Sequence, residues 1–353
     1  MQQQTSHLRW IVLLLSILLP SLAFAHKAYD RVVVFGDSLS DPGNAYYLLG
    51  TALTPPYATL NALLIPDAPY AIGGHHFSDG PTWIEQFSRS LDLKSSAGPA
   101  LVNDSKSHRQ RNNYAIGGAR ARNSGSGIDF TDQVNIYLSR GDGSNNAASL
   151  YVVEFGGNDV RDAIAALAID PTGGVSASII TDALTALSDN ILSLYASGAR
   201  VFLIANSPDL SLTPAIRTLD LLSPGSGMAA AIISAQFNAD FDALLAQLQA
   251  QLPAVSIAKL DIYHELHNIV ANPDQYRLSN VTDPCVTPNI PPYSCRMAKR
   301  TLFWDGIHPT KRGHAIFAEL ARDTLFPERE SEEIERYERH CRSKQAEASS
   351  CRH

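Results

Sequence analysis

The sequence of 353 residues is poor in cysteine and carries no excess of basic residues. Its four cysteines include no Cys-x-x-Cys pair, so the spacing typical of structural zinc sites is absent and we expect no metal. It has 28 Lys and Arg residues against 35 Asp and Glu residues, which gives a net charge of -7. Nucleic-acid binding needs a basic face, and this charge balance therefore argues against a nucleic-acid partner.

Long apolar runs are scarce as well, and the one that stands out lies at the N-terminus. His7 and Arg9 precede an apolar run at residues 10–19, and Ala23 and Ala25 form a small-residue cleavage site. This order is typical of a secretory signal peptide, which we assign to residues 1–25 with cleavage after Ala25. The run is short for a mature membrane span, although an uncleaved anchor is the alternative. We expect export to the periplasm or the medium.

The cysteines fit export, because disulfides form in oxidising compartments. Cys285 lies close to Cys295 in the sequence, and Cys341 lies close to Cys351. Three pairings are formally possible. Local pairing favours a Cys285–Cys295 disulfide, whereas the pairing of Cys341 with Cys351 stays open.

Short apolar runs alternate with helical patterns along the chain. Runs that end in Gly or polar residues are typical of buried parallel strands, and longer segments with 3.6-residue periodicity predict helices. This alternation predicts an α/β fold with a mostly parallel sheet covered on both faces. The predicted strands are residues 31–35, 150–155, 201–204 and 255–260, and the clearest predicted helices are residues 176–197 and 228–252.

Two long irregular stretches interrupt this pattern, at residues 45–80 and 268–297. Long loops in α/β domains usually lie over the active site, so we expect them there. We assign residues 26–326 to one catalytic domain. Residues 327–353 are dense in Glu and Arg with i,i+4 pairs, which predicts a solvated, charged tail.

Ser38 is the candidate nucleophile. It follows the first predicted strand within Gly36-Asp37-Ser38-Leu39. Functional groups of parallel sheets lie just past the carboxyl ends of strands, where a helix N-terminus also stabilises a developing anion. An ordinary N-capping serine is the alternative reading of this motif.

A serine hydroxyl needs a base, and His308 is the best candidate. Asp305 precedes it by three residues, close enough for its carboxylate to orient the imidazole ring within one loop. We assign no such role to the other histidines. His75 and His76 form a pair without an evident third metal ligand, and we interpret them as surface or packing residues.

Ester cleavage also needs donors for an oxyanion. Asn158 follows the strand at residues 150–155, and its side-chain amide is a suitable donor. Gly118 offers a backbone N–H that a ligand can approach without an intervening side chain. Each signal is weak alone, because glycine pairs and Asn-Asp sequences usually form turns or caps.

Taken together and in this order, these four blocks resemble the GDSL esterase/lipase family, also called SGNH hydrolases. The family's Ser, Gly, Asn and His are matched by Ser38, Gly118, Asn158 and His308, and its aspartate is matched by Asp305. Residues 40–44, 77–83 and 206–209 also resemble family segments. The similarity covers about residues 31–326, and within the family it is greatest to secreted lipases, phospholipases and haemolysin-like enzymes.

The resemblance implies a three-layer α/β/α sandwich with a central parallel sheet of about five strands, flavodoxin-like in order. It implies that the Ser38 N–H, the Gly118 N–H and the Asn158 side chain form the oxyanion hole. It further implies that His308 activates Ser38, that Asp305 orients His308, and that no cofactor is required. There is no Gly-x-Ser-x-Gly elbow at Ser38, which separates the chain from α/β-hydrolases.

The predicted function is that of a secreted serine esterase or lipase, acting on lipid or phospholipid acyl esters through a Ser38 acyl-enzyme. An acyltransferase and a carbohydrate deacetylase would use the same site, and a non-catalytic binding protein is a further alternative. We expect a monomer with an ester substrate. Transient contact with a membrane surface is left open.

Overall fold

A computed structural model describes residues 29–49, 60–70, 74–102, 111–125, 127–141, 148–286 and 295–327. The predicted signal peptide, Cys341, Cys351 and all of the predicted tail after Pro327 lie outside the described residues.

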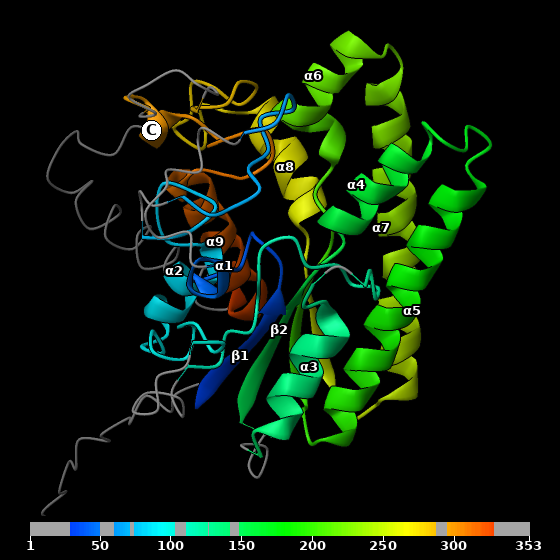
Figure 1. Ribbon diagram of the computed structural model, residues 1–353. Helices are drawn as coiled ribbons and strands as arrows, with labels where there is room; N and C mark the ends of the chain where they lie inside the picture. The colour runs from blue at the N-terminus through cyan, green and yellow to red at the C-terminus, as the bar shows by residue number, and fades with distance from the viewer. Residues whose placement is uncertain are drawn as a thin grey trace, which may run out of the picture.

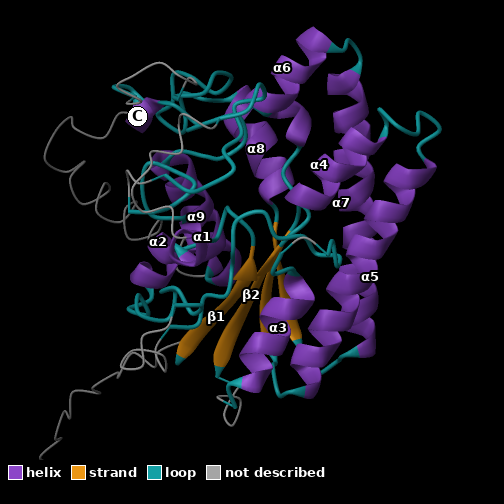
Figure 2. Cartoon of the chain, viewed as in Figure 1, coloured by secondary structure: helices purple, strands orange, loops and turns teal. Residues whose placement is uncertain are grey.

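A parallel sheet forms the centre of the molecule (Figure 2). Its strands are β1 (Arg31–Gly36), β2 (Ser149–Glu154), β3 (Val201–Ala205) and β4 (Ser256–Leu260), in the order β1-β2-β3-β4. All neighbouring pairs are parallel, with Val33 opposite Tyr151 in the register of the first pair. The four strands predicted from apolar runs are therefore confirmed, with boundaries that differ by at most one residue.

The described sheet has four strands, close to the number of about five that the resemblance implied. The place beside β1 is taken by an extended segment around Asn113, which bridges to Val34 in parallel. The Val34 N–H donates to the Asn112 carbonyl (2.9 Å), and the Tyr114 N–H donates to the Val34 carbonyl (2.8 Å). The pairing is too short to count as a strand. If this segment is nevertheless numbered as the second strand in the chain, the spatial order becomes 2-1-3-4-5, which is the flavodoxin-like order.

Helices cover both faces of the sheet and give the predicted three layers (Figure 1). Alternate residues of a strand point to opposite faces, so Val33 and Phe35 pack on one helical layer while Val32 and Val34 pack on the other. The described helices are α1 (Asn44–Leu49), α2 (Trp83–Ser90), α3 (Phe130–Ser139), α4 (Gly157–Ala166), α5 (Gly174–Ala196), α6 (Pro214–Leu222), α7 (Ser226–Gln251), α8 (Ile262–Ala271) and α9 (Lys311–Leu325), with short 3₁₀ turns at Leu210–Leu212 and Ala298–Arg300.

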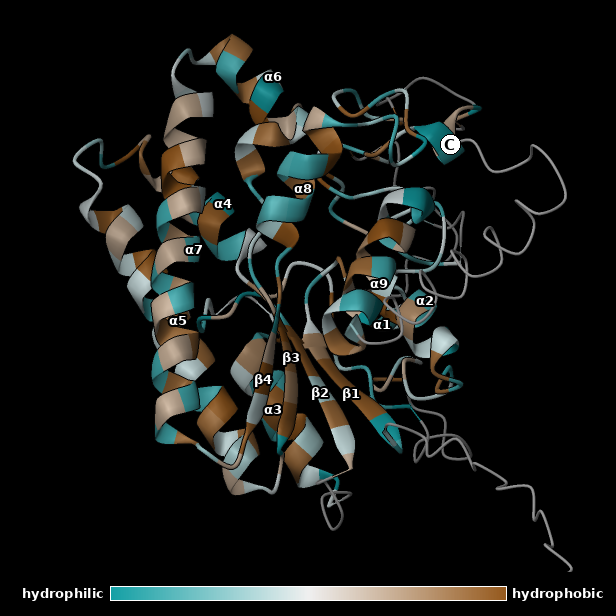
Figure 3. Ribbon diagram, turned by 180° about the vertical axis from the view of Figure 1, so that it is seen from behind, coloured by the Kyte–Doolittle hydropathy of each residue, from teal (hydrophilic) through white to brown (hydrophobic). Residues whose placement is uncertain are grey.

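The two layers differ in the helices that contribute to them. Apolar side chains of α3, α4, α5 and α7 pack on the face that carries Phe35, and those of α2, α8 and α9 pack on the face that carries Val34. The strands between them are predominantly hydrophobic along their length (Figure 3). Both long helices predicted from the sequence, α5 and α7, are confirmed.

The sheet orientation determines where function can lie, because all four strands end at the same edge. Ser38 follows β1, Asn158 follows β2 and Pro208 follows β3 at that edge. Among the described helices, none is both long and apolar enough to cross a membrane.

Candidate active site

Ser38 sits in a tight turn immediately after β1. The Asp37 carboxylate accepts a hydrogen bond from the Leu39 N–H (2.9 Å), and the Asp37 carbonyl accepts one from the Ser40 N–H (3.2 Å). Asp37 is buried, whereas Ser38 stays partly exposed. The turn therefore fixes the backbone on both sides of Ser38 and presents its hydroxyl at the sheet edge.

The structure brings Ser38, His308 and Asp305 together although the first two are separated by 270 positions. The Ser38 hydroxyl lies 2.9 Å from His308 Nε2, and His308 Nδ1 lies 2.7 Å from Asp305 Oδ2. If the His308 Nδ1–H donates to Asp305, then Nε2 is free to accept the Ser38 proton. This chain of hydrogen bonds has the geometry of an activated serine nucleophile.

Asp305 is fully buried and is held by three further donors. Its Oδ1 accepts the backbone N–H groups of Ile307 (2.9 Å) and His308 (2.8 Å). Its Oδ2 accepts the Tyr70 hydroxyl (2.9 Å) as well as the imidazole. Sequence analysis missed Tyr70, which is 235 positions away in an irregular loop and carries no local motif.

Two backbone N–H groups near Ser38 are available for an incoming oxygen. Neither the Ser38 N–H nor the Gly118 N–H donates a hydrogen bond to any residue that the structure describes. Gly118 has a φ of 83°, a left-handed conformation that glycine adopts without strain. The neighbouring Gly117 N–H is anchored on Asp41 Oδ2 (2.9 Å), which fixes the segment that presents Gly118.

Asn158 lies at the N-terminal end of α4 and borders the same cavity as Ser38 and His308. Its side-chain amide donates to Asp37 Oδ2 (3.0 Å) and to the Ala119 carbonyl (2.9 Å). Both N–H groups of the amide are thus engaged in this structure. A substrate oxygen that binds Asn158 has to share one of these hydrogens or replace its acceptor.

A buried pair of carboxyl groups lies behind the Ser38 turn. Asp37 hydrogen-bonds to Glu154, the last residue of β2, and Glu154 Oε2 accepts the Ser40 hydroxyl (2.9 Å). Burial raises the pKa of both groups, and the negative charge of Asp37 raises the pKa of Glu154 further. Glu154 is therefore hard to ionise beside Asp37, and Asp37 is the carboxyl of the pair that accepts the Asn158 amide. The signal in the sequence was a carboxyl group inside an apolar strand.

Other candidate ligands do not gather around the site. His314 is buried in α9, where burial lowers its pKa to about 3. His76 lies 2.8 Å from Glu85 at the start of α2. Within the described ranges, no group of three His, Cys, Asp or Glu side chains has the arrangement of a metal site.

Comparison with known proteins identifies the family. The family model described as GDSL-like lipase/acylhydrolase matches residues 32–321, which is most of the chain. The chain belongs to this GDSL family. It is therefore an ester-hydrolysing enzyme, as the sequence motifs predicted.

Three relatives illustrate the range of the GDSL family around this chain. A GDSL esterase/lipase from Arabidopsis thaliana is 25% identical over 82% of this chain and 84% of its own length. A phosphatidylcholine-sterol acyltransferase from Aeromonas hydrophila is 25% identical over 89% of this chain and 96% of its own length. Lipase 1 from Photorhabdus luminescens is 23% identical over 88% of this chain and 52% of its own length. These names support lipolytic or acyl-transfer chemistry, with hydrolysis favoured.

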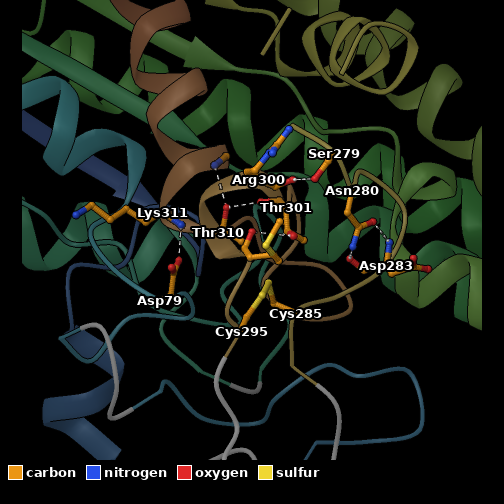
Figure 4. The surroundings of a disulfide bond; sticks show 12 residues. Asp79, Ser279, Asn280, Asp283, Cys285, Cys295, Arg300, Thr301, Thr310 and Lys311 are labelled. Carbon is orange, nitrogen blue, oxygen red and sulfur yellow. Dashed lines mark hydrogen bonds between the residues drawn. A yellow bond between two sulfur atoms is a disulfide. The ribbon is translucent and has the colours of Figure 1, made fainter. Parts of the chain in front are cut away.

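The predicted Cys285–Cys295 disulfide of this GDSL enzyme is confirmed (Figure 4). The Cys285 N–H donates to the Phe303 carbonyl (3.1 Å), so the bridged loop pairs with the segment that leads to Asp305. Both cysteines also pack against a small apolar cluster that contains Trp304. The disulfide therefore supports the backbone immediately before the Asp305–His308 pair.

Proposed function

We propose that this protein is a secreted serine hydrolase that cleaves the acyl esters of lipids through a Ser38 acyl-enzyme. The observation that carries the proposal is the hydrogen-bonded chain from Ser38 through His308 to the buried Asp305. It lies beside two backbone N–H groups with no acceptor among the described residues. The family shows ester hydrolysis, and the proposal adds the residues, the compartment and the lipid substrate.

The mechanism follows from this geometry. His308 Nε2 takes the Ser38 proton as Ser38 Oγ attacks the ester carbonyl, and Asp305 stabilises the resulting imidazolium. The Ser38 and Gly118 N–H groups receive the oxyanion, with Asn158 beside them. His308 returns the proton to the leaving alcohol. It then activates a water molecule that attacks the acyl-enzyme, which releases the acid and restores Ser38.

An exposed apolar surface supports a lipid substrate. Leu221, Leu222, Met228 and Ile232, where α6 ends and α7 begins, have exposed fractions of 86%, 70%, 72% and 62%. Apolar clusters of this kind often mark contacts with lipids or proteins. We include transient contact with a membrane surface in the proposal. Secretion is supported by the N-terminal pattern and by the disulfide.

Ser38→Ala tests the assignment directly. We expect kcat to fall by about 10⁶ while the fold is retained, because the nucleophile acts as part of a catalytic unit. A fluorophosphonate should label Ser38 in the wild type and label nothing in the variant. Ser193→Ala, at an exposed position of α5, is the matched control. Substantial turnover by purified Ser38→Ala would falsify the proposal.

A substrate panel separates the alternatives that use the same site. Acyl esters from acetyl to palmitoyl, including phospholipids, should show hydrolysis beyond acetyl esters if the protein is a lipase. Strict preference for acetyl groups on carbohydrates would instead identify a deacetylase. Adding a competing alcohol distinguishes transfer from hydrolysis, because a transferase would form a new ester in place of the free acid.

A further inference from the structure

Arg161 is a cation at the edge of the catalytic cavity to which the mechanism assigns no role. It lies on α4 three residues after Asn158, so both side chains lie on neighbouring positions of the same helical face. With Ser38, His308 and Asn158 it lines the cavity at the carboxyl edge of the sheet. A guanidinium at this position lies within reach of a substrate that occupies the cavity.

Arg161 has no partner within the described part of the chain. Among the described residues, its guanidinium makes no hydrogen bond and has no carboxylate oxygen within 4.0 Å. The nearby acidic groups of α4 are engaged by other arginines. Arg122 pairs with Asp159 (2.9 Å), and Asp162 pairs with both Arg120 (2.9 Å) and Arg122 (2.7 Å).

The surroundings of Arg161 disfavour an uncompensated charge. Burial lowers the pKa of Arg161, and the neighbouring Arg120 lowers it further, while Asp162 and Asp37 act in the opposite direction without contacting it. A half-buried guanidinium usually has a carboxylate or phosphate partner, because desolvation without one is costly. A bound anion would supply the missing charge and its hydrogen-bond acceptors.

A second cavity begins on the other side of Arg161. It shares Arg161, Leu210 and Ile307 with the catalytic cavity, and its remaining lining is almost entirely apolar. Such a lining accommodates hydrocarbon and offers no partner for a charge. Hydrocarbon therefore fits the second cavity, and Arg161, at the border of the two cavities, is the lining residue that offers a positive charge to an anionic group. The apolar lining includes Leu63, Ile65, Ile164, Ala215, Ile216 and Leu219.

We propose that Arg161 is a specificity residue that selects acyl esters whose alcohol part carries an anionic oxyacid group, a phosphate or a carboxylate. The proposal rests on the proposed ester hydrolysis at Ser38 and adds the charge of the preferred substrate. Arg is suited to this role, because its planar fork binds such groups through two hydrogen bonds at once. The acyl chain itself carries no charge, so the anion belongs to the alcohol.

Three matched butyryl esters test the preference: monobutyryl glycerol, monobutyryl glycerol 3-phosphate and the butyryl ester of glyceric acid. All three release butyrate, which a pH-stat or a coupled assay detects, and they differ only in the terminal group of the alcohol, which is a hydroxyl, a phosphate or a carboxylate. We expect the wild type to favour at least one anionic ester over the neutral one by roughly 10-fold or more in kcat/KM. The two anionic arms separate a phosphate from a carboxylate, and preference for either supports the proposal.

Arg161→Gln should reduce this anionic-to-neutral ratio to about one, and Arg161→Lys should give an intermediate ratio, since Lys keeps the charge without the fork. Arg217→Gln is the matched control. Arg217 lies on α6 beside residues of the apolar cavity, but its own side chain is exposed. This control should retain the wild-type ratio. Glycerol 3-phosphate should also inhibit hydrolysis of the neutral ester competitively in the wild type and much more weakly in Arg161→Gln.

Two results would overturn the role of Arg161: a wild-type ratio of about one for both anionic esters, or a ratio in Arg161→Gln equal to that of the wild type. An equal loss of kcat for all three esters at unchanged KM would also overturn it, because Arg161 would then act on the oxyanion. Labelling of the variants by a fluorophosphonate shows that the site is assembled. Failure of the proposed function would give a different result. In that case Ser38→Ala would still hydrolyse esters, or the wild type would hydrolyse none of the three.

Discussion

Asp41 holds together the loops that carry Ser38 and Gly118, and its replacement by Asn is a sharp test of the site. Its Oδ1 accepts the N–H groups of Gly43 (2.8 Å) and Asn44 (2.6 Å). Its Oδ2 accepts those of Ala45 (3.1 Å) and Gly117 (2.9 Å). An Asn side chain has only one oxygen, so two of these four N–H groups lose their acceptor.

The magnitude of the effect on stability is the difference between two opposing terms. Two lost hydrogen bonds to a charged acceptor cost about 3–6 kcal/mol together. Desolvation outweighs them, because burial raises the pKa of Asp41 from 3.8 to about 6 even with its four hydrogen bonds in place, so the charged form at pH 7 carries a net cost of about 3 kcal/mol. We therefore expect Asp41→Asn to change the free energy of unfolding at pH 7 by no more than about 3 kcal/mol in either direction.

Activity should suffer more than stability. When the NH₂ group of the introduced Asn side chain lies beside Gly117, the Gly117 N–H loses its hydrogen-bond acceptor. Gly118, the proposed oxyanion donor, is the next residue in the chain. Removing one oxyanion donor lowers kcat by about 10²–10³, and a displaced donor should cost at least 10-fold. We expect kcat to fall by about 10- to 10³-fold with little change in KM, because the oxyanion forms after the substrate binds.

The same residue predicts a pH dependence of stability. A carboxyl whose pKa is raised on folding stabilises the protein below its unfolded value, and this stabilisation is lost as the pH rises through the folded value. For Asp41 the window is pH 3.8 to about 6, over which the wild type should lose about 3 kcal/mol of unfolding free energy from this group. Asp41→Asn should lack this component.

Steady-state kinetics and urea unfolding between pH 4 and 7 measure both effects. Asp182→Asn makes the same chemical change at an exposed position of α5 and should leave kcat and stability unaltered. If Asp41→Asn kept kcat within about threefold of the wild type, the inferred link from Asp41 through Gly117 to Gly118 would be wrong.

Three further predictions concern the rest of the site. Asn158→Ala should lower kcat by about 10²–10³ with little change in KM; a higher KM at constant kcat would make Asn158 a substrate-binding residue. Asp305→Asn should lower kcat severalfold more than Tyr70→Phe, which removes only one of the donors to Asp305; equal kcat values in the two variants would contradict this order. Replacing both Cys285 and Cys295 by Ser should lower the free energy of unfolding by about 2.5–3 kcal/mol for a loop this short, and unchanged urea unfolding would show that the crosslink does not stabilise the fold.

Local patterns in the sequence were sufficient for much of the fold. Apolar runs located all four strands, and the 3.6-residue periodicity located α5 and α7. These patterns are visible because a buried strand or an amphipathic helix needs its apolar residues at fixed spacing. The segment at Asn113 was not located in this way, because it pairs with β1 over only a few residues.

Some residues of the candidate site were likewise predictable from local sequence patterns, and others were not. Asp305 and His308 are three residues apart, so their relation was visible in the sequence, and Ser38 was visible because it follows a strand. The engagement of Asn158 with Asp37 was not visible, because the two residues are 121 positions apart. Tyr70 and Asp41 were likewise assigned no role from sequence, since each acts through a partner that the sequence does not identify.

The sequence by itself determined the order of strands and helices, the family motifs and which residues we propose as nucleophile, base and acid. Only the tertiary structure decided which side chains share a hydrogen bond, that Asp37 and Glu154 are buried side by side, and that Arg161 on α4 has no carboxylate partner among the described residues. The physical reason is that hydrophobic periodicity is a local property, whereas pairing and desolvation depend on neighbours that the parallel sheet brings together from distant positions.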